Sequence, residues 1–396
     1  MVTRKIELKN PERFEGEYKI SKTKLGNAII KATDKLRENI TKFGDKFPLD
    51  DSVNFVYPLA DNNNWGCGMY TGLYWLAYEL TGDKVFREAA ENQVKFHRER
   101  IKNRYNFYDH DVGFVVTPSC VAGYKLTGNE EMKKSALDIA EFFYNYSYSK
   151  KGGFILRCAS HADEEGGCRT MMDTLMNIPL LFWAGEMTGD KKYTEAAISQ
   201  YKITEKCLIR DDASSYHHYS FDVKTHEPVR GVTLQGHSDE SCWSRGHSWG
   251  VYGFPIAYSY THDESLIELH KNVTYFMLNH LPDDLVPYWD YDFVSGEEAR
   301  DSSAGAVAVC GMHEMCRHLP DDAPQKKIFE NASAQMLEAL IDKCTESPVK
   351  ETDGILFKVT GSVPHNCCIE ECAMYGDYPY LEALMRFANS EWKMYW

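Results

Sequence analysis

Six short segments of the sequence place aromatic, acidic or basic side chains directly before, or in the first turns of, apolar helical stretches. Two carboxylates among tryptophan, arginine and histidine side chains are the groups that glycoside hydrolysis uses, and tryptophan rings offer flat apolar surfaces to sugars. The side chains in these segments indicate an aromatic cleft that presents Asp111 and Asp173 to a sugar. The segments are Trp65-Gly66, His110-Asp111, Asp173, Trp243 to Trp249 with Arg245 and His247, Arg300-Asp301 and Tyr375-Gly376-Asp377.

Each of these side chains also has a purely structural interpretation. Asp111 stands before Val112-Gly113, where an aspartate usually caps a helix. Asp173 lies among methionines and a leucine, and a carboxylate in such surroundings needs a polar partner. Arg245 suits either a buried ion pair or a bidentate contact with a ligand carboxylate, and His217 either a satisfied strand position or a ligand contact. For all the residues of the six segments together, a purely structural explanation is weaker than a functional one, because these residues recur at one place in a repeat.

That repeat consists of an apolar helical stretch, a short turn and an amphipathic helical stretch. The stretch before each turn is rich in aromatic and small residues, whereas the stretch after it shows the i, i+3, i+4 pattern of one exposed face. In the first three turns a glycine suits the left-handed position after a helix, and Asp or Asn caps the next helix. The turns are Leu80–Asp83, Leu126–Asn129, Met187–Asp190, Tyr260–Asp263 and Leu319–Asp322.

With one more helix at each end of the chain, the repeat predicts an all-α fold, an (α/α)6 barrel of six inner and six outer helices. We expect residues 22–396 to form this single catalytic domain after an N-terminal arm, residues 1–21. Alternation and β-branched residues predict a small β-hairpin near 215–234. Since all inner helices of such a barrel begin at the same rim, the six segments should converge there. An open helical solenoid is the weaker alternative, because the last inner helix would lack an outer partner.

The composition of the chain limits the kinds of molecule that it can bind. The formal net charge of −15 argues against nucleic acid and anionic membranes, and the mean hydropathy is −0.48. The N-terminus has no apolar stretch typical of a secretory signal, so we expect a cytoplasmic protein whose twelve cysteines are reduced thiols. The cluster Cys367, Cys368 and Cys372 lacks the second pair that zinc sites use, so no metal is predicted. A monomer or homodimer is expected.

The motifs resemble those of the unsaturated glucuronyl hydrolases, glycoside hydrolase family 88. The longest matching stretch, Gln235 to Gly250, is also the most specific, and the matches together span roughly residues 55 to 385. The matching stretches are Asn64–Gly72, His110–Phe114, Met172–Asn177, Gln235–Gly250 and Tyr375–Tyr378.

The resemblance implies an (α/α)6 barrel that removes the 4,5-unsaturated uronic acid from the non-reducing end of lyase-generated oligosaccharides. It assigns Asp173 as general acid/base and Asp111 as the second essential carboxylate. The implied reaction hydrates the C4=C5 double bond, after which the hemiketal opens, and it requires no cofactor. The implied substrate-binding residues are Trp65, His110, His217, Gln235, Arg245, Trp249 and Tyr375.

The sequence departs from the family pattern in two places. Leu156-Arg157-Cys158 stands where many relatives carry a tryptophan, so an aromatic platform beyond the uronate is in doubt. The stretch Val359–Met385 contains no Lys or Arg, which predicts no strong preference for sulfated substrates. Three alternatives stay open: an unsaturated rhamnogalacturonyl hydrolase, a sugar epimerase that uses His217 and His247 for proton transfer, and a non-catalytic sugar-binding protein.

Overall fold

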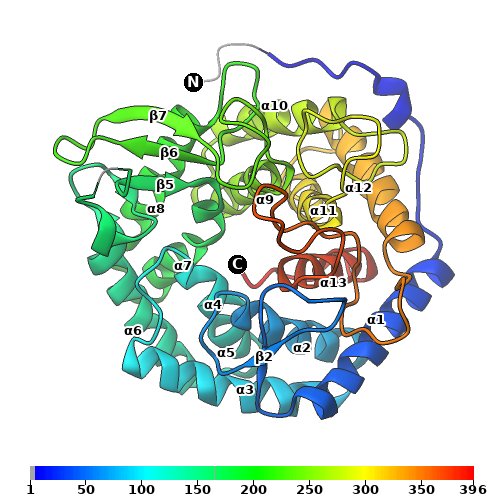
Figure 1. Cartoon of the computed structure of the whole chain (residues 1–396), viewed down its shortest axis with the longest axis horizontal. Coiled ribbons are helices and arrows are strands. Elements are labelled where there is room, and N and C mark those ends of the chain that lie inside the picture. Colours follow the sequence, from blue (N-terminus) through cyan, green and yellow to red (C-terminus); the bar gives the residue numbers. More distant parts are fainter. Residues whose placement is uncertain (1–4, 165) are drawn as a thin grey trace.

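The computed structural model describes residues 5–164 and 166–396, and its helices form a closed ring of two layers (Figure 1). The inner layer has six helical segments, four of which are single continuous α-helices, namely α2, α9, α11 and α13. The outer layer has six helices and begins with α1. The inner segments are α2 (Cys67–Thr81), α4 (Val112–Val116) continued by the π-turn η2 (Thr117–Val121) and α5 (Ala122–Thr127), the 3-10 segment η4 (Met172–Met176) with α7 (Pro179–Thr188), α9 (Ser244–Thr261), α11 (Ser302–Cys316) and α13 (Met374–Ala388).

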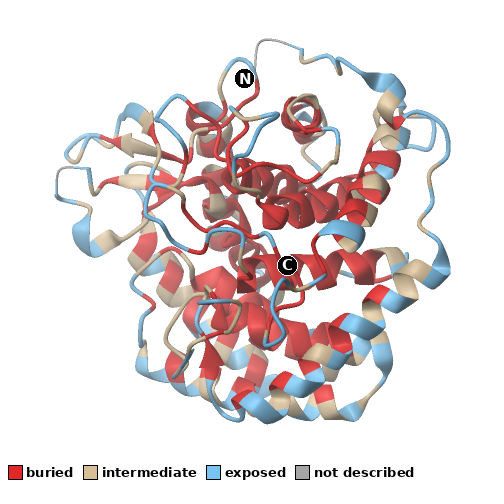
Figure 2. Ribbon diagram, turned by 45° about the vertical axis from the view of Figure 1, so that its right-hand side comes forward, coloured by how far each residue is buried: buried red, intermediate tan, exposed pale blue. Residues whose placement is uncertain are grey.

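The outer helices follow their inner partners along the chain, except that α1 covers α13 and closes the ring. The predicted barrel of six inner and six outer helices is therefore confirmed. The inner helices are buried on nearly all sides, whereas the outer ones expose one face (Figure 2). The outer helices are α1 (Lys22–Phe43), α3 (Lys84–Asn103), α6 (Glu130–Ser147), α8 (Lys191–Ile203) extended by η5 (Thr204–Leu208), α10 (Ser265–Asn279) and α12 (Pro324–Lys343).

The turns between the layers have the predicted caps. Gly82 ends α2 in the left-handed conformation at φ +70°, which an L side chain adopts only with strain. The Asp83 carboxylate then accepts a hydrogen bond from the Val85 backbone N–H and so caps α3. In the fourth turn His262 takes the left-handed position at φ 52°, so the motif tolerates a residue other than glycine there.

A three-stranded antiparallel sheet lies beside the ring. The hairpin expected near 215–234 is present as β6 (His218–Phe221) and β7 (Pro228–Val232), and β5 (Arg169–Met171) adds a third strand next to β6. The sheet helps to position the predicted catalytic residue Asp173, because β5 leads directly into η4, which contains Asp173. Two shorter strand pairs are also present, β1 (Phe47–Pro48) with β2 (Leu59–Ala60) and β3 (Tyr148–Ser149) with β4 (Phe154–Ile155).

The N-terminal arm runs along the outside of the ring (Figure 1). The Ile6 N–H donates to the Asn272 side chain over 3.0 Å, and the Asn331 amide donates to the Phe14 carbonyl over 2.8 Å. A short 3-10 turn, η1 (Pro11–Phe14), buries Phe14. These contacts attach the described part of the arm to α10 and α12.

None of the helices described has the length and apolar character needed to cross a bilayer.

Asp377, near the start of α13, is a buried carboxylate that organises the fold. It accepts hydrogen bonds from the Leu356 and Ile355 N–H groups and the Tyr57 hydroxyl, at 2.9, 3.1 and 2.9 Å. Burial raises the pKa of Asp377 to about 7, although these hydrogen bonds oppose the shift. Protonation of this side chain therefore stabilises the folded state relative to the unfolded chain, where the pKa is about 4.

We expect Asp377→Asn to remove this pH dependence. The native carboxyl contributes stability that is fully present below the unfolded-state pKa and is lost as the pH rises toward 7. The difference in unfolding free energy between the native protein and the variant should therefore grow by about 2–3 kcal/mol from pH 8 to pH 5. Denaturant unfolding across this range measures it, with Asp138→Asn on the exposed face of α6 as the control. A pH-independent difference would show that Asp377 is ionised when folded.

Candidate active site

A cavity of about 340 Å³ opens at the rim where the inner segments begin. Four of the six inner segments contribute side chains to it, and Trp65 lies directly before α2, whereas α11 contributes none. It contains five aspartates, two arginines and one histidine among its walls. The residues that line it are Asp50, Asp51, Trp65, Asp109, His110, Asp111, Phe114, Arg157, Met171, Asp173, Leu234, Gln235, Trp243, Arg245, Trp249, Gly361, Ser362, Cys367 and Tyr375.

Asp111 and Asp173 meet at one imidazole nitrogen. His110 Nε2 lies 2.9 Å from an Asp173 carboxylate oxygen and 3.5 Å from an Asp111 carboxylate oxygen. The other ring nitrogen, Nδ1, contacts Asp109. Asp111 occupies the N-cap position of α4, but its side chain makes no capping hydrogen bond. The capping interpretation of Asp111 is therefore wrong, and both carboxylates face one cavity.

The cluster of Asp109, His110, Asp111 and Asp173 binds protons more strongly than isolated side chains do, since the pKa values of His110 and Asp111 are raised. Burial alone would lower the pKa of His110, but Asp111, Asp109 and Asp173 raise it well above its usual value. Burial raises the pKa of Asp111 well above its ordinary range, and the charges of Asp109 and Asp173 add to this, although His110 opposes it. Three carboxylates and one imidazole within contact share their protons as a unit. At neutral pH a proton donor thus lies in direct contact with Asp173.

A close approach of backbone to backbone sets the separation of the two carboxylates. Gly113, in the first turn of α4, packs against Asn177, and a Cβ added to Gly113 would lie 2.4 Å from the Asn177 Cα and carbonyl oxygen. The Asn177 side chain accepts from the Phe114 N–H at 2.9 Å and donates to the Asp173 carbonyl at 3.2 Å and to Asp111 at 3.4 Å. Asn177 therefore joins the two segments, a role the sequence did not indicate.

We expect Gly113→Ala to separate Asp111 from Asp173. Because the clash is with backbone, the segments must move, which should lower the unfolding free energy by about 1–3 kcal/mol and activity by about 100-fold. Gly26→Ala is a matched control, since nothing lies within 4 Å of its added Cβ on the outer helix α1. That substitution should stabilise the protein by about 0.5–1 kcal/mol and leave activity unchanged. Full activity in Gly113→Ala would mean that the carboxylate separation is not critical.

Aromatic rings form one wall of the cavity. Trp65 stacks on Tyr375 at 5.4 Å between ring centroids, with only 12° between the planes. Phe114 contacts both Trp65 and Trp249 at 5.3 Å. The predicted positions of Trp65, Trp249 and Tyr375 at the cleft agree with this arrangement. Such a wall suits the apolar face of a sugar ring.

Arg245 lines the cavity, but protein groups occupy its guanidinium. It donates to the Asp301 carboxylate at 2.7 Å and to the carbonyl oxygens of Thr360 and Gly361 at 2.6 and 2.9 Å. The guanidinium also lies over the ring of Tyr375 at 4.2 Å. Arg245 thus forms a buried ion pair and holds the 360–361 backbone at the cavity edge, while its contact with a ligand stays a prediction.

Two of the converging carboxylates do not face the cavity. Asp301 pairs with Arg245 and accepts from the Ser303 N–H at 3.2 Å, while Asp377 binds the backbone of 355–356. The expectation that Asp301 and Asp377 reach the mouth was wrong, because each turns inward to satisfy buried donors. Asp50 and Asp51, which the sequence did not indicate, line the cavity instead. Burial raises the pKa of Asp50 to about 7.

Gln235 and His217 lie on the side of the sheet. The Gln235 amide nitrogen donates to the Gly361 carbonyl at 2.9 Å, which leaves its oxygen for other donors. His217 Nδ1 accepts from the Leu234 and Gln235 N–H groups at 3.2 and 3.3 Å, so its proton resides on Nε2. Nε2 is buried and has no hydrogen-bond partner among the described residues. His217 packs on Trp243 at 4.4 Å rather than lining the cavity itself.

His247 lies apart from the cavity. Its Nε2 donates to the Val273 carbonyl at 2.8 Å, and its Nδ1 lies 3.1 Å from the Ser215 hydroxyl. Both ring nitrogens thus have buried protein partners, and neither is available to a sugar. Among the residues that the structure describes, one group could hold a cation, namely Asp109, His110 and Asp111, whose ligand atoms lie within 4.8 Å of one another. His110 uses both nitrogens for carboxylates there, so the set is already internally satisfied.

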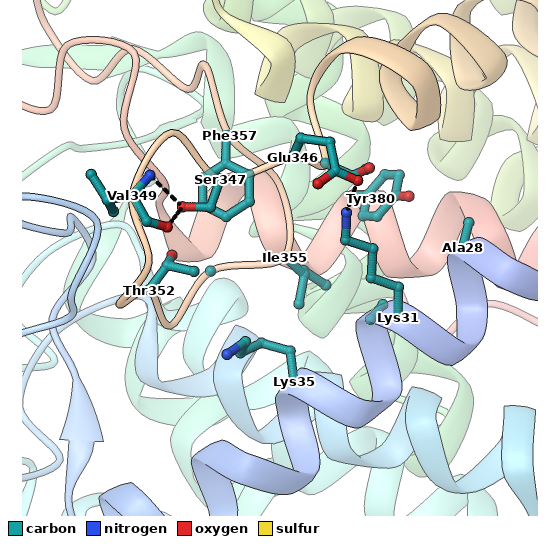
Figure 3. A pocket seen from close by; sticks show the side chains of 13 residues that line it. Ala28, Lys31, Lys35, Glu346, Ser347, Val349, Thr352, Ile355, Phe357 and Tyr380 are labelled. Atoms are coloured by element: carbon teal, nitrogen blue, oxygen red, sulfur yellow. Dashed lines mark hydrogen bonds and ion pairs between the residues drawn. The ribbon is translucent and has the colours of Figure 1, made fainter.

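A second cavity, of about 280 Å³, lies on the outer side between α1 and the loop 345–357 (Figure 3). Lys31 and Lys35 project toward it from α1, and Lys31 pairs with Glu346 (Figure 3). Its walls carry no pair of facing carboxylates and no tryptophan. Of these two cavities, the one at the rim therefore has the groups that sugar chemistry needs.

Comparison with known proteins gives one consistent group of relatives. A family model described as Glycosyl Hydrolase Family 88 matches residues 39–312. The unsaturated chondroitin disaccharide hydrolase of Streptococcus pneumoniae is 41% identical over 390 residues, which cover 98% of each chain. The structure of unsaturated glucuronyl hydrolase from Streptococcus agalactiae is similar with a TM-score of 0.95 at 38% identity, covering 99% of this chain and 98% of that one. A mutant of that enzyme complexed with dGlcA-GalNAc6S gives a TM-score of 0.88 at 36% identity, with the same coverage.

Proposed function

Since the chain belongs to glycosyl hydrolase family 88 and is a glycoside hydrolase, we propose that it removes the 4,5-unsaturated uronic acid from the non-reducing end of lyase-generated glycosaminoglycan oligosaccharides. The observation that carries this proposal is the placement of Asp111 and Asp173 around one imidazole nitrogen in an aromatic cleft. A carboxyl group beside a second, proton-rich group is the arrangement that general acid catalysis needs.

The reaction proceeds by hydration of the double bond. Asp173 gives a proton to C4, and the positive charge that develops at C5 is shared with the ring oxygen. Water adds to C5 and loses its proton to a carboxylate of the cluster. The hemiketal that results opens and releases the remaining sugar, so water is consumed and the conjugated double bond disappears.

The structure suggests how Asp173 regains its proton. His110 Nε2 lies 2.9 Å from the Asp173 oxygen, and three flanking carboxylates keep the imidazole protonated, as described above. Proton transfer over this distance needs no intervening water. Asp111 completes the cluster, and burial raises the pKa of its carboxyl group well above its ordinary range, so it shares protons with His110. His110 and Asp111 thus act as the proton reservoir for Asp173.

The test is a panel of lyase-derived disaccharides followed by loss of ultraviolet absorbance. The proposal predicts loss of the absorbance of the conjugated double bond together with release of the second sugar. An epimerase would leave the absorbance unchanged, and a binding protein would show affinity without turnover. Disappearance of absorbance only with unsaturated galacturonyl-rhamnose substrates would favour an unsaturated rhamnogalacturonyl hydrolase.

The epimerase alternative is now weaker for a structural reason. It required two histidines at the sugar, but His247 is bonded to Val273 and Ser215 away from the cavity. The rhamnogalacturonyl alternative shares the hydration chemistry. Similarity over nearly the whole chain to hydrolases of glucuronyl and chondroitin disaccharides favours the glycosaminoglycan substrate.

We further propose a reducing compartment, the cytoplasm, for this enzyme. Its twelve cysteines are free, and ten of them are buried, as expected of thiols that pack as small apolar groups. A monomer or homodimer is expected. Fractionation of the source cells and light scattering of the purified chain test these two points.

A further inference from the structure

After α13 the chain turns back into the centre of the ring, where the end marked C lies (Figure 1). Trp396 is 2% exposed there. Its indole N–H donates to Glu382 at 3.0 Å, and its backbone oxygen accepts from the Tyr260 hydroxyl at 3.1 Å and from the Lys125 ammonium at 3.3 Å. Since these partners belong to α13, α9 and α5, three inner segments of the barrel hold Trp396 in place.

Three aromatic rings meet the Trp396 indole edge to face. They belong to Phe114, Tyr252 and Tyr378, at centroid distances of 6.1, 6.4 and 5.7 Å and with interplanar angles of 87°, 84° and 90°. Aromatic rings favour this perpendicular arrangement, because the positive edge of one ring meets the negative face of the other. The contacts therefore fix the plane of the indole and, with it, the position of the Phe114 ring.

Of these three rings, the Phe114 ring is the one that also lines the active-site cavity. It contacts Trp65 and Trp249 in the aromatic wall, each at 5.3 Å between centroids. Trp396 itself is not among the residues that line the cavity, so it reaches the wall only through Phe114. Because protein interiors are close-packed, a void at Trp396 would let the Phe114 ring move away from the two tryptophans.

We propose that Trp396 is a positioning residue that holds the aromatic wall of the sugar site in place through Phe114. This inference rests on the proposed function, which assigns the wall to sugar binding. In this role Trp396 touches no substrate and takes no part in proton transfer. Its loss should therefore weaken sugar binding, which raises KM, and leave the chemical step measured by kcat nearly unchanged.

The test compares kcat and KM of the native enzyme, Trp396→Gly and Trp396→Phe for an unsaturated chondroitin disaccharide. Trp396→Gly should raise KM about tenfold and change kcat less than about threefold. Trp396→Phe keeps a ring against Phe114 but loses the hydrogen bond to Glu382, and its KM should stay within about twofold of the native value. Free indole added to Trp396→Gly should fill the void, as aromatic molecules fill engineered apolar cavities, and lower KM toward the native value.

The matched control is Trp392→Gly. Trp392 lies in the same segment, is 4% exposed and donates its indole N–H to Glu79 at 2.9 Å. Within the described residues its ring contacts the ring of Tyr395 but no aromatic ring that lines the cavity. Partial unfolding removes active molecules and so lowers the apparent kcat without altering KM. Trp392→Gly should therefore lower the unfolding temperature while KM stays native.

A native KM in Trp396→Gly overturns the proposal, and so does an equal rise of KM in Trp392→Gly, which would reflect a general disturbance of the segment. An equal rise in Trp396→Phe would assign the effect to the lost hydrogen bond with Glu382. Indole that raises the unfolding temperature of Trp396→Gly but leaves its KM high would assign the effect to displaced backbone and also overturn the proposal.

Two further outcomes have a defined meaning. If Trp396→Gly does not fold, Trp396→Leu takes its place with the same expected rise in KM, because leucine fills part of the void without a ring. Native turnover of the disaccharide with an unchanged KM in the variants would contradict this inference alone. Absence of turnover by the native enzyme would contradict the proposed function, and this inference with it.

Discussion

Asp173→Asn should reduce kcat for an unsaturated disaccharide at least about 1,000-fold while leaving the fold intact. An amide is isosteric with the carboxyl group but cannot give a proton to C4. The contact with His110 Nε2 at 2.9 Å survives, because the amide oxygen accepts the same hydrogen bond. Initial rates from the ultraviolet absorbance of the double bond measure the loss, and thermal unfolding measures the fold.

The matched control for this substitution is Asp138→Asn. Asp138 lies on the outer helix α6, where its carboxylate pairs with Arg104 at 2.8 Å and is half exposed. Loss of such a surface pair should cost less than about 1 kcal/mol and leave kcat unchanged. If Asp173→Asn keeps more than a few per cent of the native rate, Asp173 is not the acid. The mechanism would then have to use Asp111 or His110 directly.

The ring of helices followed from the sequence because its signals are local. Each glycine or aspartate at a turn acts on its own helix end, as Gly82 and Asp83 do between α2 and α3. The alternation of apolar and amphipathic stretches then assigns helices to the inner and outer layers. The strand β5 was missed because it has only three residues, too few for any period to appear.

The site was predictable only as far as backbone position determines it. Trp65, Asp111, Asp173 and Tyr375 reach the cavity because each stands where an inner segment begins. Asp301 stands at an equivalent place, yet turns inward to Arg245. Spacing along the chain gives the rim at which a side chain starts, but not the direction in which it points.

The residues that the sequence did not reveal depend on contacts between distant segments. Asn177 was part of a matching motif, but its role follows from the packing of Gly113 against it. Asp50 reaches the cavity from a loop before α2 and is held by the Gly66 N–H at 2.7 Å. Such roles follow from contacts between segments that are distant along the chain, and sequence periodicity contains no information on those contacts.

A buried ion cluster at the other end of the inner helices offers a large effect on stability. Arg386 on α13 donates to Glu314 on α11, to Glu382 one turn earlier, and to the Tyr252 hydroxyl at 2.7 Å on α9. The Arg386 and Glu382 side chains are 1% and 0% exposed. Trp396 covers the cluster and donates to Glu382 at 3.0 Å. One arginine thus neutralises two buried carboxylates and joins three inner helices.

We expect Arg386→Met to lower the unfolding free energy by about 3–5 kcal/mol, because it leaves Glu382 buried without a cation and Glu314 with His318 as its remaining basic partner. Denaturant unfolding at neutral pH measures the loss. Adding Glu314→Gln and Glu382→Gln to that variant should recover part of it, since the uncompensated charges are then gone. Arg87→Met is the control: Arg87 pairs with Glu91 at the same i, i+4 spacing, but on the exposed face of α3, and its loss should cost about 0.5 kcal/mol or less. Equal effects of the two single substitutions would mean that burial adds nothing to the pair, and that the inner helices are held by apolar packing alone.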